Sequence, residues 1–300
     1  MRSAPHRPDG PKVVALGGGH GLAVALRAIH RYTCAITAVV SVADDGGSSG
    51  RLRRDLGVPP PGDLRKCLVA LADDEGPWRD VFEHRFTGGE LEGHSLGNLV
   101  LAGLTESLGD FVAALDEAAA LLHAHGRVLP ATKEAVVLKA DVEGGAVEGQ
   151  VAVSNSNKPI RRVELVPRDA PAHPDAVAAI RGADQVVVAP GSLYTSVLPV
   201  LCVPDLRDAV AETSASVVQV ANLHPQHPET SGLDGTDHLR AVVEHGGKVG
   251  TYLYQRDGSM PVDEQAVRDL GAEPVGADVA RPDGQAHDPE RLAAALSAVL

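Results

Sequence analysis

Short apolar runs alternate with longer amphipathic stretches along most of the chain. Valine-rich runs with the length of buried strands occur at 12–16, 36–42, 184–189, 216–221 and 249–254. Stretches of helical periodicity, rich in alanine and leucine, follow several of these runs. Strands that are apolar at nearly every position are typical of a parallel sheet with both faces covered. The pattern therefore predicts an α/β fold in which a mostly parallel sheet lies between helices.

The middle of the chain has a different pattern. Residues 135–141, 147–153 and 161–166 alternate apolar and polar side chains, as half-exposed antiparallel strands do. We expect a small antiparallel β insertion at 128–167, within a single α/β domain that spans 12–300. Residues 1–11 are polar and contain prolines, so we expect a disordered leader there.

Capping residues mark several expected helix starts. Asp63, Ser95, Asp110 and Asp288 each lie at the beginning of a stretch with helical periodicity. A further helix is expected at 174–181. Residues 44–51, which combine acids, glycines and serines, are expected to form a loop.

Composition narrows the classes of partner. The chain has 27 Lys and Arg against 40 Asp and Glu, a formal net charge of −13, whereas nucleic acids and anionic membranes require a basic surface. No apolar run reaches the roughly 18 residues of a membrane span, and the N-terminal segment lacks the apolar core of a signal peptide. Three widely separated cysteines without metal-ligand spacing are expected to be reduced thiols. We expect a cytoplasmic protein that binds neither nucleic acid nor membrane.

The first apolar run ends in a glycine-rich loop at 17–21 that leads into a helix. Gly17 and Gly19 fit the first two positions of the dinucleotide fingerprint G-x-G-x-x-G, but Leu22 occupies the third position and no Walker lysine follows. Glycines at such a turn permit positive φ and a close approach of a ligand to free N–H groups at the helix start. A purely structural tight turn is the alternative.

Further loops of small and polar residues are expected at the same edge of the sheet, at 44–51, 61–65, 191–196 and from Asn222 onward. Because ligands bind outside the carboxyl ends of parallel strands, these loops would line one pocket for phosphate groups. The candidate binding residues are Gly17, Gly18, Gly19, His20, Gly21, Asp44, Asp45, Gly46, Gly47, Ser48, Ser49, Arg51, Gly62, Asp63, Arg65, Asn98, Gly191, Ser192, Leu193, Tyr194, Thr195 and Asn222.

The acids in these loops would repel a diphosphate unless a cation intervenes. Asp44 and Asp45 offer hard oxygen ligands that suit Mg²⁺ bound partly through phosphate oxygens; turn formation and helix capping are their alternative roles. Arg51, Arg65 and Lys66 supply positive charge, and guanidinium groups match phosphate geometry. Four hydroxyl side chains are expected either to donate to phosphate or to cap helices, namely Ser48, Ser49, Ser192 and Thr195.

No catalytic residue is assigned. Ser95 follows a polar loop rather than a strand, so the sequence Gly93-His94-Ser95-Leu96-Gly97 does not form a nucleophile elbow. We expect His94 and Ser95 to cap a helix. The remaining histidines show no paired spacing for a metal.

The loop sequences, taken in order, resemble a known family. G-G-G-H-G-L, V-A-D-D-G-G-S-S-G-R-L, P-P-G-D-L-R, G-H-S-L-G-N-L and P-G-S-L-Y-T-S-V-L-P are similar to motifs of the gluconeogenesis-factor family, within the group that contains 2-phospho-L-lactate transferase. The resemblance covers about residues 12–290. It implies a Rossmann-like three-layer fold, a role in cell shape and in growth on gluconeogenic carbon, and binding of UDP-N-acetylglucosamine. The partners it brings into consideration are the cell-wall machinery, a Ser/Thr kinase and a second copy of the chain.

The transferase branch of this group is the alternative function. Its enzymes join a nucleotide-activated phospholactate to a deazaflavin, with a metal near the acidic pair, and need a broad aromatic or apolar bed for the ring. The chain has 3 Phe, 4 Tyr and 1 Trp, and among these only Tyr194 is expected near the pocket. A nucleotide-sugar-binding protein without catalysis is therefore the favoured hypothesis. His20 and Lys66 depart from the family, where threonine and asparagine are commoner.

Overall fold

A seven-stranded parallel sheet forms the centre of the protein, whose computed structural model describes residues 10–72 and 77–300. Its strand order is β10-β9-β8-β7-β1-β2-β3, and each strand is parallel to its neighbours. The strands are β1 (Val13–Gly17), β2 (Ile36–Val40), β3 (Arg127–Pro130), β7 (Gln185–Val188), β8 (Ser216–Val220), β9 (Thr251–Gln255) and β10 (Glu273–Ala277). The expected parallel sheet is confirmed. Residues 1–9 of the expected leader lie outside the described part of the chain.

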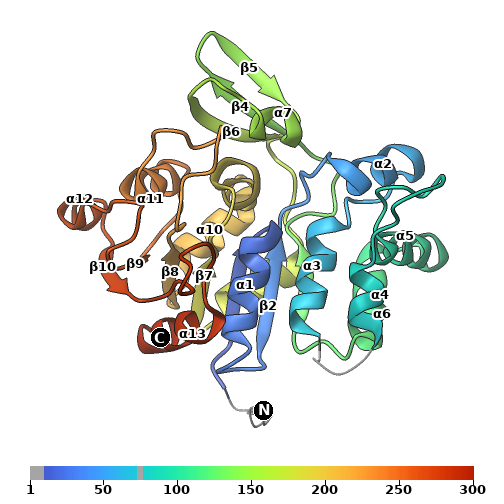
Figure 1. The fold of residues 1–300 in the computed structure, drawn as a ribbon, viewed down its shortest axis with the longest axis horizontal. Helices are drawn as coiled ribbons and strands as arrows, with labels where there is room; N and C mark the ends of the chain where they lie inside the picture. The colour runs from blue at the N-terminus through green and yellow to red at the C-terminus, as the bar shows by residue number, and fades with distance from the viewer. Residues whose placement is uncertain (1–9, 73–76) are drawn as a thin grey trace.

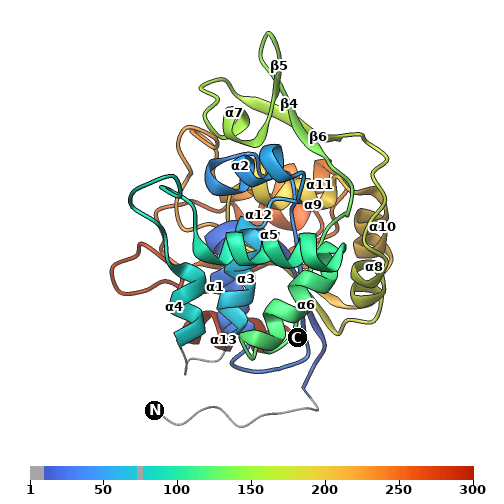
Figure 2. The same ribbon diagram turned by 90° about the vertical axis from the view of Figure 1, so that its right-hand side faces the viewer.

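Helices cover both faces of this sheet, which confirms the three-layer arrangement. In Figure 2, α1, α3 and α4 lie to one side and α8 and α10 to the other. α3 and α8 each contact β2 and β3, so these two strands are covered on both faces. The helices flanking the sheet are α1 (Gly19–Ile29), α3 (Gly62–Leu71), α4 (Pro77–Glu83), α5 (Leu96–Leu108), α6 (Phe111–Leu121), α8 (Pro174–Arg181), α9 (Leu198–Leu201), α10 (Pro204–Glu212), α11 (Gly235–Glu244), α12 (Glu264–Asp269) and α13 (Pro289–Ala298).

The central strands owe their position to uninterrupted apolar sequence. Every residue of β1 and β7 is buried, and valine packs well on a pleated surface covered on both faces. Gln185 is the polar exception in β7. Its side-chain amide donates to Leu296 O at 2.9 Å and accepts from the Tyr32 hydroxyl at 2.6 Å, so its burial leaves no unpaired polar group.

A three-stranded antiparallel sheet projects from one end of the main body, as Figures 1 and 2 show. It consists of β4 (Val137–Val142), β5 (Gly145–Glu148) and β6 (Ile160–Val166), in the order β5-β4-β6. The expected β insertion at 128–167 therefore starts too early, because residues 127–130 form β3 of the main sheet.

The expected strand at 147–153 is also only partly correct. Its first residues end β5, and α7 (Gln150–Ser154) follows after Gly149, whose φ is 97°. The Asp45 carboxylate accepts from the N–H groups of Gln150 and Val151 at 3.0 and 2.9 Å. These bonds satisfy amides at the helix start, a tertiary contact that the local sequence does not reveal.

Most of the expected helix starts are confirmed. Ser95, Asp110 and Asp288 cap α5, α6 and α13 with their side chains, and Asp63 lies in the first turn of α3. The expected loop at 44–51 is wrong in its second half, because α2 (Gly47–Leu56) begins there. Gly50 permits this helix, since a Cβ atom on it would lie 1.9 Å from Asp45 O.

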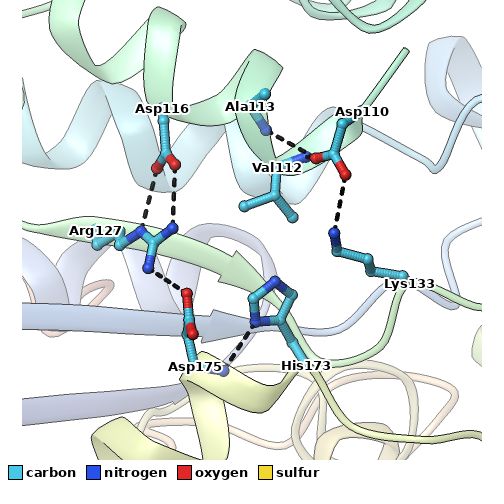
Figure 3. Close-up of polar contacts among 8 residues, drawn as sticks. All are labelled: Asp110, Val112, Ala113, Asp116, Arg127, Lys133, His173 and Asp175. Atoms are coloured by element: carbon cyan, nitrogen blue, oxygen red, sulfur yellow. Dashed lines mark hydrogen bonds and ion pairs between the residues drawn. The ribbon is translucent and has the colours of Figure 1, made fainter. Parts of the chain in front are cut away.

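Ion pairs tie α6 and α8 to the edge strand β3, as Figure 3 shows. The Arg127 guanidinium bonds to both carboxylate oxygens of Asp116, at 3.2 and 3.1 Å, and to Asp175 at 2.5 Å. Charged side chains along an edge strand discourage pairing with another chain. The charged network at β3 therefore disfavours pairing of this edge with a strand of another chain.

Candidate functional site

The strand order places a crevice beside β1. From β1 the chain proceeds through β2 and β3 in one direction, whereas β7 to β10 extend the sheet in the other. Ligands of open α/β sheets bind outside the carboxyl ends of the strands at such a switch point. A cavity of about 260 Å³ lies here, lined by Gly18, Gly19, His20, Gly21, Asp44, Asp63, Lys66, Gln150, Gly191, Ser192, Ser196 and Gln226. Eight of these residues were predicted from the loops.

The first turn of α1 opens onto this cavity. Gly18 is its N-cap and offers no side chain, and no acid occurs in the first turn. Gly19 has φ of 64°, and a Cβ atom there would meet only Ser196 Oγ, at 4.0 Å. Because the unpaired amides of a helix start carry partial positive charge, this end of α1 suits an anion.

Two glycines bring the loops after β1 and β7 together. A Cβ atom on Gly21 would lie 1.9 Å from Pro190 O, so the start of α1 packs directly against the backbone of the second loop. Asn222, at the end of β8, then fixes that loop. Its side chain accepts from Gly191 N and donates to Gly191 O, both at 2.8 Å. Asn222 therefore positions the cavity wall without lining it.

Two acids and one lysine give the cavity its charges. Lys66 Nζ lies 3.0 Å from Asp63 Oδ1, and a Cβ atom on Gly18 would lie 2.8 Å from Asp63 Oδ2, so this pair sits against the glycine loop. Burial raises the pKa of Asp44 above its ordinary value, and the charge of Asp63 acts in the same direction. Among the lining residues, Lys66 supplies the positive charge.

His20 is the titratable group at the start of α1. Its side chain stays largely exposed, yet desolvation is the largest of the causes that lower its pKa, followed by the positive charge of Lys66. The ring makes no hydrogen bond to another described residue. It is therefore available to a ligand.

Asp44 and Asp45 do not form the expected metal-binding pair. Asp44 lines the cavity and accepts from Gly46 N at 2.9 Å, whereas both oxygens of Asp45 are taken by the start of α7. In residues 10–72 and 77–300, no group of three or more His, Cys, Asp or Glu side chains could hold a metal ion. Because both Asp45 oxygens already accept amides of α7, Asp45 is not placed to share a Mg²⁺ with Asp44, and of the two only Asp44 lines the cavity.

Several predicted phosphate ligands instead form a buried network behind the cavity. Arg65 donates to Asn98 Oδ1 at 3.0 Å and to Phe82 O at 2.9 Å. Asn98 Nδ2 donates to Ser48 Oγ at 3.1 Å, and His94 Nδ1 lies 3.0 Å from the same oxygen. These polar groups satisfy one another in the interior, so the network joins α2, α3 and α5, and none of its four side chains lines the cavity.

The remaining predicted residues of the first three loops shape the backbone. Ser49 Oγ accepts from Gly62 N at 3.0 Å, which ties α2 to α3. Arg51 donates to Glu92 O at 2.7 Å, away from the cavity. The other three are Gly17 at the end of β1, with φ of 147°, Gly46 at the N-cap of α2 and Gly47, with φ of 48°.

A buried carboxylate occupies the start of the helix after β7. This segment is η1 (Leu193–Val197), a π-helix. Glu229 Oε1 accepts from Tyr194 N at 2.7 Å and from Thr195 N at 3.2 Å, and Oε2 accepts from the Thr195 hydroxyl at 3.1 Å. Leu193, Tyr194 and Thr195 are buried and are not in the cavity lining. The expected phosphate contacts at this turn are therefore already taken.

Four lining residues are outside the list of candidate binding residues. Lys66 was expected only to supply positive charge, and Ser196 only as the last residue of the 191–196 loop, whereas Gln150 comes from α7 and no local pattern marks it. Gln226 carries a further signal. Its Oε1 is buried and has no hydrogen-bond partner among the described residues. Buried polar atoms are usually paired, so this oxygen is an exception within a residue that lines the cavity.

Fold and site together define a Rossmann-like α/β protein with an amide-lined pocket at its topological switch point. The chain belongs to the CofD family, because the family's sequence profile, described as 2-phospho-L-lactate transferase CofD, matches residues 13–288. Within it the chain belongs to the gluconeogenesis factors. It is 46% identical over 237 residues to the gluconeogenesis factor of Halalkalibacterium halodurans, covering 78% of this chain and 74% of the relative.

Two further comparisons agree with this assignment. The gluconeogenesis factor of Bacillus subtilis strain 168 is 45% identical over 239 residues, 79% of this chain and 75% of its own. A crystal structure of a member of the UPF0052 family from Bacillus halodurans superposes with a TM-score of 0.92 at 39% identity, covering 96% of this chain and 99% of that one. In the described part of the chain, no helix has the length and apolar character to cross a membrane.

Proposed function

We propose that this protein binds UDP-N-acetylglucosamine at the carboxyl ends of β1 and β7 and acts as a regulatory binding protein. The observation that carries the proposal is the open first turn of α1, which faces the cavity beside Lys66. Backbone amides and one ammonium group are the chemistry that holds a diphosphate. Gln226 Oε1, buried and unpaired, supplies an acceptor for a ligand donor.

Binding without turnover is favoured over transfer to a deazaflavin. A deazaflavin needs a broad apolar surface, but no Phe, Tyr or Trp lines the cavity beside β1 or a second cavity at the carboxyl ends of β8, β9 and β10. Tyr194, which the sequence placed near the pocket, is buried, and its hydroxyl donates to Ile160 O at 3.2 Å. We therefore do not propose transferase activity for this protein.

Calorimetry tests the assignment directly. The protein is titrated with UDP-N-acetylglucosamine, UDP-glucose, GDP and NAD, each with and without Mg²⁺. UDP-N-acetylglucosamine should bind most tightly, and tighter binding of GDP or NAD would overturn the proposal. Incubation with a nucleotide-activated phospholactate and a deazaflavin should give no product. Product formation would establish the transferase instead.

Two charge reversals locate the site. Lys66→Glu places a third acid beside Asp63 and the glycine loop, so it should abolish binding. Arg51→Glu is the matched control, because Arg51 contacts Glu92 O and does not line the cavity. Equal losses from both variants would place the ligand elsewhere.

In the cell, the bound state is proposed to report nucleotide-sugar supply to the cell-wall machinery in the cytoplasm. A strain that carries Lys66→Glu in place of the wild-type protein should then show the shape and growth defects of a deletion strain on gluconeogenic carbon, whereas Arg51→Glu should restore both. Rescue by Lys66→Glu would separate the cellular role from ligand binding.

A further inference from the structure

A second cavity, of about 410 Å³, lies at the carboxyl ends of β8, β9 and β10. Its wall is fixed by Gln255 at the end of β9. The Gln255 Oε1 atom accepts from Val279 N at 2.8 Å and from Ala280 N at 2.7 Å. The segment after β10 is thereby tied to β9, so this wall is formed before any ligand arrives.

One ring in the second cavity has a defined hydrogen-bonding state. His224 Nε2 lies 2.8 Å from Gly284 O, and because a carbonyl only accepts, Nε2 must carry the proton. The other ring nitrogen, Nδ1, lies 2.7 Å from Ser259 Oγ, and the Ser259 hydroxyl lies 3.1 Å from Leu223 O, to which it donates. These contacts hold the His224 ring and the Ser259 side chain in place, and both residues line the cavity.

Two charged side chains in this cavity make no close polar contact. Arg281 and Asp257 line it, and within residues 10–72 and 77–300 neither side chain has a hydrogen bond or an ion pair, although the charge of Arg281 helps to lower the pKa of Asp288. The neighbouring Arg291, by contrast, is paired with Asp278 and donates to Ala280 O at 3.3 Å. Asp257 also has φ of 54°, a conformation that costs free energy for a residue other than glycine.

The two cavities share one segment of chain. Asn222 holds the Gly191 wall of the first cavity, Leu223 and His224 line the second, and Gln226 lines the first again. The two cavities therefore border the same short segment, and only the residue between His224 and Gln226 separates a lining residue of one from a lining residue of the other. The first alone, at about 260 Å³, is smaller than the roughly 300–1,000 Å³ of typical ligand pockets.

We propose that one ligand spans both cavities, with its diphosphate in the first and its hexose ring in the second, where Arg281, Asp257, His224 and Ser259 recognise hydroxyl and amide groups. This inference rests on the proposed function. A mixture of donors and acceptors suits a polyhydroxylated ring. The absence of aromatic side chains from this lining disfavours a stacked nucleobase, for which aromatic platforms are the usual partner.

Truncating Arg281 tests this placement. Arg281→Ala, at an exposed side chain, should weaken UDP-N-acetylglucosamine binding at least tenfold and leave UDP binding unchanged, both measured by calorimetry. Asp257→Asn should show the same selectivity with a smaller loss. Arg268→Ala is the matched control, because Arg268 pairs with Glu264 on α12 outside both cavities.

The possible outcomes separate the two proposals. If wild-type protein binds neither ligand, the proposed function fails and this inference falls with it. If wild-type protein binds UDP-N-acetylglucosamine and Arg281→Ala binds it equally well, only the hexose placement is overturned. If Arg281→Ala weakens UDP and UDP-N-acetylglucosamine equally, the second cavity holds the nucleoside, which also overturns it.

Discussion

The side-chain amide of Asn222 bonds to both polar backbone atoms of Gly191, so β8 holds the turn that follows β7. The N and O atoms of Gly191 lie beyond the end of β7, and Asn222 lies beyond the end of β8. Hydrogen bonds between neighbouring strands therefore cannot hold this turn. The shape of the first cavity therefore depends on one amide that does not line it.

Asn222→Ala should weaken ligand binding more than it weakens folding. Each lost hydrogen bond contributes about 1 kcal/mol, and the freed Gly191 turn would have to be ordered again on binding. We expect a roughly tenfold rise in Kd, equivalent to about 1.4 kcal/mol, by calorimetry. Gln265→Ala, which removes an exposed side-chain hydrogen bond on α12, should leave Kd unchanged. A large loss of thermal stability with unchanged Kd would contradict this role.

Gly19 and Gly21 should respond to alanine in opposite ways. Gly21→Ala drives a Cβ atom onto Pro190 O, and overpacking of this kind costs about 1–3 kcal/mol of unfolding free energy. An alanine methyl group at Gly19 would meet no close atom and would enter the cavity. The backbone there has a φ of 64°, a conformation that costs an alanine about 1–2 kcal/mol. Denaturant unfolding and calorimetry should show the larger stability loss at Gly21 and the larger affinity loss at Gly19. The reverse order would remove Gly19 from the binding surface.

Asp110 should make folding stability depend on pH in the acid range. Its hydrogen bonds from Ala113 N and from the Lys133 ammonium group, shown in Figure 3, hold its pKa at about 2, below the roughly 3.9 of an unfolded aspartate. The stabilisation is therefore complete above about pH 4 and is lost as pH falls toward 2. Asp110→Ala should cost about 1 kcal/mol at pH 7, since the site is exposed, and the difference from wild type should vanish near pH 2.

Asp110→Asn is the control for this effect. Asparagine caps helices as well as aspartate does but does not titrate and loses the Lys133 pair. Its stability at pH 7 should lie within about 0.5 kcal/mol of wild type. A pH profile for Asp110→Asn as steep as that of wild type between pH 4 and pH 2 would assign the acid dependence to another group.

Ligand affinity should rise as pH falls, through His20. Desolvation and Lys66 lower the pKa of the free ring, so it is neutral near pH 7, and a bound diphosphate would raise that pKa. Binding then takes up a proton, and the affinity gained is present below the bound-state pKa and lost above it. Calorimetry between pH 8 and pH 6 should show Kd decreasing for wild type and flat for His20→Thr. An unchanged slope in His20→Thr would exclude this residue.

The sequence was sufficient to predict the layers and the edge where the site lies. The apolar runs that became β1, β2, β7 and β8 are buried at nearly every position and therefore show no polar alternation. Once the strands are parallel, their carboxyl ends must meet at one edge. The convergence of the glycine loop with the turn at Gly191 follows from topology and not from any single motif.

The direction in which each side chain points could not be predicted from the sequence in the same way. Successive residues on a helix differ in direction by about 100°, so the neighbours Arg65 and Lys66 point to different environments, one into the interior and the other into the cavity. The guanidinium group was expected to be the phosphate ligand because of its geometry, but Lys66 and not Arg65 lines the cavity. Gln150 was missed because only the packing of α7 brings it near the glycine loop.

Asp44 and Asp45 are consecutive residues with separate tasks, one in the cavity wall and the other at the start of α7. A single peptide unit joins them, so the cavity wall and the start of α7 are parts of one short segment of backbone, and α7 in turn contacts β4 and β5. The antiparallel sheet, although it projects from the main body, is therefore anchored to the same loop that shapes the cavity.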